Sequence, residues 1–173
     1  MRLASLSTCL LLPVLLLVGR DRPVPTRPVT IRLVDAQSGI QLPGLVRVTG
    51  PDGQAVPLPT LLNRGVGLLN KQPLIDTWSV LPSARRVALP RQPVTIAAFS
   101  GLETELSQQK IDLSKQAPKT ITLKLNRFYS AAEQGLRSAN THLHLMKISR
   151  EQCDRYLKEI PRADGPDMVF LSY

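Results

Sequence analysis

The stretch VTIRLV, at residues 29–34, decides the fold of this chain. Its apolar side chains alternate with polar ones, so an extended segment buries one face and exposes the other. Its β-branched residues also favour a strand. Similar segments of strand length follow at 45–49, 77–80, 86–89, 93–98, 103–113 and 120–125. Because no segment between 29 and 126 has the length and period of a long helix, the pattern predicts a mainly β chain built as a β-sandwich.

Turn residues separate these strands. Asp35 and the pair SG at 38–39 can close a turn after the first strand. The tripeptide PDG at 51–53 has turn chemistry, which predicts a hairpin over residues 45–58. The stretch 58–74 contains two glycines and reads as a loop or an irregular crossing between sheets.

The pattern changes beyond Asn126, where two strands and a helix are expected. Residues 137–145 run into a candidate strand, and SREQ at 149–152 is a capping box that marks the start of a helix. The run DMVFLS at 167–172 is typical of a buried parallel strand. The order strand, helix, strand predicts one βαβ unit of an α/β domain. We expect the boundary between the two domains near 127–136.

The expected helix has one apolar face. Cys153, Tyr156, Leu157 and Ile160 fall at i, i+3, i+4 and i+7, which places them on one side. Pro161 is expected to end the helix because proline has no N–H to donate. On this face Cys153 would be a small buried hydrophobe.

The chain has only two histidines, His142 and His144, and they lie in the segment THLHL at 141–145. In a strand, residues i and i+2 point to the same face, so the two imidazoles can converge on one metal ion. Imidazole suits zinc, iron or manganese, and an open metal site would activate water. The alternative is that both are ordinary polar residues of a strand, since two ligands do not make a metal site.

Four other residues are weaker candidates. Asp164 and Asp167 flank a turn and could be acidic ligands, although a solvated connection between helix and strand is the simpler interpretation. Trp78 is expected in the core or at the edge of the sandwich, and if exposed it could stack on a sugar. Ser172 lacks the G-x-S-x-G context of a nucleophile elbow.

The segment NTHLHL at 140–145, after a β-domain and before a capped helix and a buried strand, resembles the start of the PHP (polymerase and histidinol phosphatase) superfamily. Its secreted CehA/McbA-type metallohydrolases are the most similar members. The resemblance covers residues 129–173. It implies that His142 and His144 are ligands of a divalent zinc, manganese or iron ion. It also implies that the remaining His, Asp and Glu ligands come from later strands.

A second resemblance covers residues 29–49. The pattern VDxxSGxxLPGxVxV at 34–48 is similar to the opening of carboxypeptidase regulatory-like domains, which are prealbumin-like β-sandwiches. Within it, Pro43 and Gly44 would redirect the chain into the second strand. The resemblance implies a domain that assists folding, attachment or partner binding and carries no catalytic residues.

Residues 1–19 read as an export signal. Arg2 supplies the positive start, and CLLLPVLLLVG at 9–19 is an apolar core. That core is shorter than the roughly 20 residues of a membrane span. Residues 3–19 are uncharged, however, so an uncleaved membrane anchor is the alternative. Residues 20–28 form a Pro/Arg-rich linker. We expect an exported protein of the periplasm, the cell envelope or the extracellular space.

The net charge is +9, yet its distribution does not indicate a nucleic-acid partner. The basic residues are scattered, and Arg85 and Arg86 are the only adjacent pair. No basic stripe carries interleaved aromatic residues, as a nucleic-acid groove would. Weak attraction to anionic envelope polymers is compatible with this charge.

These expectations describe a β-sandwich at 29–127, of prealbumin-like or immunoglobulin-like type, followed at 128–173 by the first βαβ unit of an incomplete PHP-type α/β barrel. The chain would be a fragment of a secreted metal-dependent hydrolase acting on an ester, amide, carbamate or phosphoester. Its full-length form would act on a small molecule or an envelope polymer. As this chain it would be inactive and hold no metal tightly, because most ligands are missing. The alternative is an envelope-associated binding or adhesion module with a vestigial C-terminal tail.

Overall fold

The computed structural model of this chain describes residues 24–115 and 118–172. The expected signal or anchor at 1–19 lies outside these residues. Strand β1 (Thr26–Asp35) begins within the last residues of the expected linker and contains the whole VTIRLV stretch. Within the described residues, no helix has both the length and the apolar character that a membrane crossing needs.

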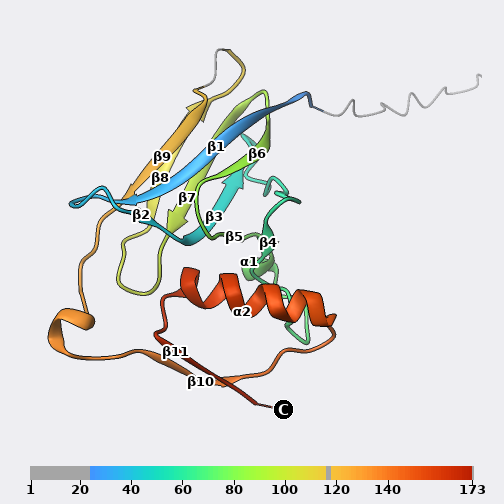
Figure 1. The fold of residues 1–173 in the computed structure, drawn as a ribbon. Helices are drawn as coiled ribbons and strands as arrows, with labels where there is room; N and C mark the ends of the chain where they lie inside the picture. Colours follow the sequence, from blue (N-terminus) through green and yellow to red (C-terminus); the bar gives the residue numbers. More distant parts are fainter. Residues whose placement is uncertain (1–23, 116–117, 173) are drawn as a thin grey trace, which may run out of the picture.

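Strand β1 is the centre of the first of the two larger sheets (Figure 1). Strand β6 (Arg85–Pro90) runs antiparallel along its N-terminal half. The short β2 (Gln41–Leu42) pairs with its C-terminal end. Strand β9 (Thr120–Leu125) runs parallel to β1 along the opposite edge. The two ends of the sandwich sequence therefore meet in this sheet.

The second sheet has five antiparallel strands in the order β4-β5-β3-β7-β8. At its centre is β3 (Gly44–Thr49), between β5 (Ser79–Leu81) and β7 (Pro93–Phe99). The outer strands are β4 (Leu62–Asn63) and β8 (Ser107–Asp112).

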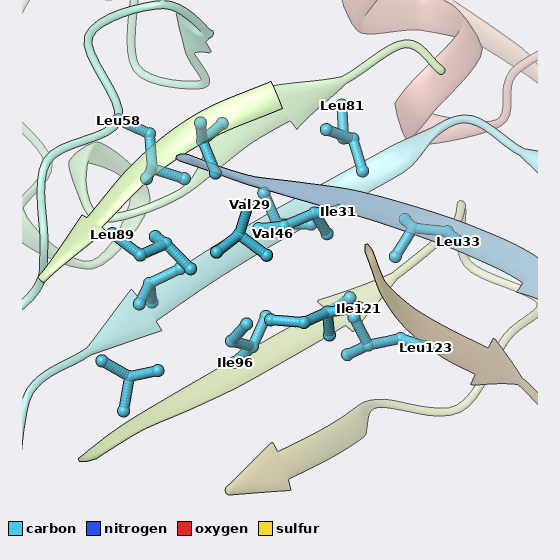
Figure 2. Close-up of a cluster of buried hydrophobic side chains, with 14 of the residues drawn as sticks. Val29, Ile31, Leu33, Val46, Leu58, Leu81, Leu89, Ile96, Ile121 and Leu123 are labelled. Atoms are coloured by element: carbon cyan, nitrogen blue, oxygen red, sulfur yellow. The ribbon is translucent and has the colours of Figure 1, made fainter. Parts of the chain in front are cut away.

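The two sheets face each other across one apolar core (Figure 2). Alternate residues of β1, Val29, Ile31 and Leu33, point into it and are at most 1% exposed, as their spacing predicted. Val46 and Ile96 of the second sheet meet them from the other side. All buried members of this core lie between residues 29 and 125. The chain is thus mainly β, as predicted, and its two larger sheets fit a β-sandwich.

The hairpin expected over residues 45–58 forms only as a short one. Beyond the turn an antiparallel bridge joins Thr49 and Ala55, and the Val56 N–H donates to the Val48 carbonyl at 2.8 Å. The pairing stops there because β5 takes the same edge of β3 at Gly44–Val46. The chain instead inserts Leu58 and Leu61 into the core.

Two other stretches also differ from expectation. The segment 58–74, expected to be a loop or crossing, includes β4 and leads into a one-turn helix, α1 (Pro73–Asp76). The strand expected over 103–113 begins only at β8, because the Thr104 side chain closes a turn with Ser100 and its backbone forms an isolated bridge with Arg127. The Thr104 hydroxyl accepts from the Ser100 N–H at 2.7 Å and donates to the Ser100 carbonyl at 2.9 Å.

The C-terminal part of the chain forms a βαβ unit. A 3-10 turn, η1 (Ala132–Gln134), precedes β10 (Ala139–Leu143), α2 (Arg150–Asp164) and β11 (Met168–Leu171). Strands β10 and β11 pair in parallel, as a βαβ unit requires. Figure 1 shows α2 between this pair and the sandwich.

The start of α2 was predicted correctly, and its end was not. The Gln152 N–H donates to the Ser149 hydroxyl at 3.2 Å, and the Ser149 N–H donates to the Gln152 side chain at 3.0 Å, which completes the capping box. The helix continues through Pro161 for one further turn. Proline removes one hydrogen bond there. The last turn is held from outside, because Ala163 is buried and its carbonyl accepts from the Gly101 N–H at 2.9 Å.

The buried face of α2 also differs from the predicted one. Tyr156, Ile160 and Ala163 are buried, and Cys153 is half-buried on the same stripe. Leu157 is 39% exposed, although its spacing placed it on the apolar face. The buried stripe is rotated around the helix relative to the predicted face, because the position of the sheet against which the helix packs decides which residues are covered.

That sheet is the outer face of the β4-β5-β3-β7-β8 sheet. Leu45, Leu62 and Val80 point away from the sandwich core and form a second apolar cluster with Tyr156 and Ile160 of α2. The helix therefore covers a face of the sandwich that would otherwise be open to solvent. The two predicted parts of the chain share this cluster.

Candidate functional site

His142 and His144 lie at the C-terminal end of β10 with their side chains together. Their Nε2 atoms are 2.9 Å apart, and their ring centroids are 4.5 Å apart. Both residues are exposed, whereas Leu143 between them is 9% exposed and belongs to the cluster under α2. The i, i+2 spacing predicted this proximity, and the structure brings the two imidazoles together.

An irregularity in β10 precedes the pair. Asn140 is opposite Val169 and Leu143 is opposite Leu171, so β10 carries one extra residue in this interval. The His142 N–H, which lies in the interval, donates to the Asn140 side-chain oxygen at 3.2 Å. Bulges of this kind re-aim side chains and are frequent beside functional sites.

The geometry of the pair is close to what a metal ion needs. Two nitrogens bound to one tetrahedral zinc at about 2.0–2.1 Å lie roughly 3.3 Å apart. The observed 2.9 Å is slightly shorter, and a small rotation of either exposed side chain opens it. A hydrogen bond between two ring nitrogens uses one proton and one lone pair. A metal ion would take the place of that shared proton.

The rest of a ligand set is not assembled around the pair. Within residues 24–115 and 118–172, no group of three or more His, Cys, Asp or Glu side chains is arranged to hold a metal ion. A catalytic zinc normally has three protein ligands and a water. The histidines therefore offer two neutral ligands and leave room for others.

Asp164, one of the weaker ligand candidates, forms an ion pair instead. Arg64 binds it through two parallel hydrogen bonds, from Nε to Oδ1 at 3.0 Å and from a terminal nitrogen to Oδ2 at 2.6 Å. Both side chains are about a quarter exposed, at 23% and 24%. Burial raises the pKa of Asp164, and the Arg64 charge opposes that rise. The pair ties the end of α2 to the segment after β4.

Asp167, the other acidic candidate, organises the entry to β11. Its Oδ2 accepts from the Ser138 N–H at 2.8 Å and lies 3.2 Å from the Ser138 hydroxyl. The backbone hydrogen bond is the main reason that the pKa of Asp167 falls below its usual value. Asp167 thus aligns the start of β11 with the start of β10, and within the described residues neither aspartate joins the histidines in a group that could hold a metal ion.

A cavity of about 910 Å³ adjoins the histidine pair. It lies between the outer face of the sandwich, α1, the turn at 100–103, β10 and the C-terminal end of α2. His142 contributes to its wall, and His144 does not. Its volume is within the range of small-molecule sites, about 300–1,000 Å³.

Two aromatic side chains of the sandwich, Trp78 and Phe99, line this cavity. Trp78 packs edge-to-face against Phe99, with ring centroids 5.0 Å apart, and the Arg47 guanidinium lies 4.7 Å from the Trp78 ring. Trp78 is half-buried at the edge of the second cluster, in agreement with its predicted place at an edge of the sandwich. Its ring forms part of the cavity wall.

Sequence reasoning missed the role of the sandwich in this site. Arg64, Phe99 and Arg162 were not candidates, yet each lines the cavity. A signal was available in the strands. Pairs of consecutive apolar residues, such as Leu45 with Val46, put a large side chain on both faces of an antiparallel strand. Such pairs indicate a sheet that is covered on both sides.

Comparison with known proteins finds no family model, no curated protein and no solved structure that matches this chain.

Proposed function

We propose that this chain carries two metal ligands, His142 and His144, of a metal-dependent hydrolase centre of the PHP type. The observation that carries the proposal is the convergence of the two imidazoles, with Nε2 atoms 2.9 Å apart, at the C-terminal end of a strand in a βαβ unit. Parallel α/β domains place their sites at that end of their strands. Bound zinc, manganese or iron would supply an activated water for an ester, amide, carbamate or phosphoester.

The sheet that carries the two histidines has the features of an incomplete sheet. In the described part of the chain, β10 and β11 pair only with each other, so each has a free edge. Phe170 and Met168 of β11 are 54% and 48% exposed, whereas a parallel sheet normally has both faces covered. These features are typical of the beginning of a larger parallel sheet that further strands would extend.

In the same proposal the sandwich is an accessory domain of prealbumin-like type. The turn after β1 supports this part, because Asp35 Oδ1 accepts from the Ser38 N–H at 2.8 Å in the segment that resembles regulatory-like domains. Export to the envelope or beyond remains part of the proposal through residues 1–19. A binding module with a vestigial tail is the less favoured candidate, since α2 shares an apolar cluster with the sandwich.

The test uses the fact that this chain has two histidines only. Zinc and manganese are titrated into the full chain and the imidazole signals are followed by NMR. We expect both imidazoles to shift together in weak, rapidly reversible binding. His144→Ala should abolish the response of His142 to zinc, whereas Lys147→Ala, in the neighbouring turn, should leave it unchanged.

Ester and phosphoester assays complete the test. We expect no turnover that depends on His142, because two ligands do not complete a catalytic centre. A response confined to one imidazole, or binding that survives His144→Ala, would remove the shared metal site. A tight stoichiometric site or His142-dependent hydrolysis would show that the missing ligands are supplied elsewhere, for example by a second copy.

A further inference from the structure

We propose that the cavity between the sandwich and the βαβ unit binds a small amphipathic organic anion, namely a single-chain acyl carboxylate taken up from solution. The apolar chain would lie against Trp78 and Phe99, and the carboxylate would bind Arg162. His142 contributes to the wall of this cavity, but binding of the anion through Arg162 requires no metal ion on the histidines.

The charge of the cavity selects an anion. Three arginines line it, and two of them are neutralised within the wall. Arg64 is paired with Asp164, and Arg127 is paired with Glu103 at 2.6 Å. Arg162, by contrast, takes part in no ion pair within the described residues. One positive charge is therefore uncompensated, and a carboxylate can bind guanidinium through two parallel hydrogen bonds.

The wall of the cavity selects an apolar body for that anion. Trp78 and Phe99 form an edge-to-face pair in it. Two further lining residues, Leu102 and Leu74, are 88% and 81% exposed. Large apolar side chains that are exposed in the lining of a cavity are typical of ligand sites, because a ligand removes them from water. A headgroup at Arg162 and a chain along this wall would use both features.

The chain contains a built-in reporter of this binding. Trp78 is the only tryptophan of the chain, and it lines the cavity. Titration of the full chain with laurate, in the presence of EDTA, should therefore quench or shift the tryptophan fluorescence with a saturable curve. In the series octanoate, decanoate and laurate, affinity should rise by about fourfold per added methylene until the cavity is filled.

Two pairs of variants separate the charge from the apolar contact. Arg162→Met should weaken laurate binding by about tenfold, the value of a charge-assisted hydrogen bond. Arg150→Met, which removes the same charge from the same helix outside the cavity, should leave the affinity within about twofold of the unmodified chain. Leu102→Ser should also weaken binding, and Leu106→Ser, at a neighbouring exposed leucine outside the cavity wall, should not.

A dodecyltrimethylammonium probe tests the sign of the charge. It carries a cationic head on a saturated chain of nearly the same length as that of laurate, and it should not saturate the fluorescence response. Equal binding of the two probes, or equal effects of Arg162→Met and Arg150→Met, would overturn the proposal. Binding to phosphatidylglycerol vesicles without binding to monomeric laurate would overturn it as well, because the site would then belong to a membrane surface.

Discussion

Asp35 closes the turn after β1 with one carboxylate oxygen. Its Oδ1 accepts from the Gln37 N–H at 3.1 Å, from the Ser38 N–H at 2.8 Å and from the Ser38 hydroxyl at 2.9 Å. These hydrogen bonds, above all the one from the Ser38 backbone, lower the pKa of Asp35 below 3.8. The turn is thus stabilised by the ionised form of the side chain.

Replacing Asp35 with asparagine should therefore destabilise the protein in a pH-dependent way. The folded pKa is lower than the unfolded one, so the contribution of Asp35 is present above the ordinary value of 3.8 and is lost as pH falls through the folded pKa. In urea unfolding, the midpoint of Asp35→Asn should lie below that of the unmodified chain at neutral pH. The two midpoints should approach each other under acid conditions. A constant gap would contradict this explanation.

At Gly44, the first residue of β3, there is no room for a side chain. A Cβ added there would meet the carbonyl oxygen of Phe99 and would lie 2.7 Å from Cδ1 of Leu33. The Phe99 contact is with backbone in the paired strand and has little room to shift. We expect Gly44→Ala to lower the free energy of unfolding by about 1–3 kcal/mol, as overpacking usually does. Gly39→Ala is a poor control because of its positive φ, so Ala55→Gly, at an exposed position, is the better comparison.

At the scale of elements, the central feature is the docking of α2 on the outer face of a sheet. Apolar residues of β3 and β5 meet the helix, and the ion pair of Arg64 with Asp164 fastens its last turn. Beside that pair, Gly101 and Gly165 bring their backbones into contact, since a Cβ on Gly165 would lie 2.9 Å from the Gly101 Cα. The helix is therefore held at its C-terminal end by backbone, charge and packing.

A double-mutant cycle measures the charged part of this docking. Arg64→Met and Asp164→Asn should each cost about 1–2 kcal/mol in unfolding free energy, because each leaves a largely buried polar partner unpaired. The double variant should cost less than their sum, with a coupling of about 1 kcal/mol.

The control for the cycle is Arg155→Met, because the Arg155 side chain is 43% exposed in its pair with Glu159 on the same helix, against 23% for Arg64. It should cost less than about 0.5 kcal/mol. The cost of Arg64→Met should also shrink on acidification, since without the arginine only burial acts on the pKa of Asp164 and raises it further. Additive single effects would show that the two side chains do not stabilise each other.

At the scale of the whole molecule, the sandwich and the βαβ unit differ in how far each can fold independently. The sandwich has a complete core of its own between residues 29 and 125. The βαβ unit buries Tyr156 and Ile160 in a cluster that it shares with Leu45, Leu62 and Val80 on the outer face of the sandwich. A parallel pair of strands with one helix would lose this part of its cover if it stood alone.

A fragment of residues 24–127 should therefore fold as an all-β domain but with reduced stability. Circular dichroism should show sheet with little helix, and unfolding should remain cooperative. The loss of the cover over Leu45, Leu62 and Val80 should cost on the order of 3 kcal/mol. Trp78 fluorescence should shift to the red, because its surroundings become wetter. A helix-rich spectrum, or an emission identical to that of the full chain, would contradict this division of the molecule.

The sequence by itself determined the features that depend on neighbours along the chain. Alternation placed Val29 and Ile31 in the core, turn chemistry placed Asp35 in a turn, and the capping box fixed the start of α2. The i, i+2 spacing also brought His142 and His144 together. These features follow from the period of a strand and the hydrogen-bonding needs of a helix end, which are set within a few residues.

Only the tertiary structure decided the rest. The partners of β3, the extension of α2 past Pro161 and the cavity beside His142 all depend on contacts between distant segments. Arg64 and Asp164 are separated by 100 positions in the sequence, and nothing in either local context marks them as partners. The physical reason is that periodicity states which face of an element is apolar, whereas the choice of the surface that covers it is made by packing the whole chain.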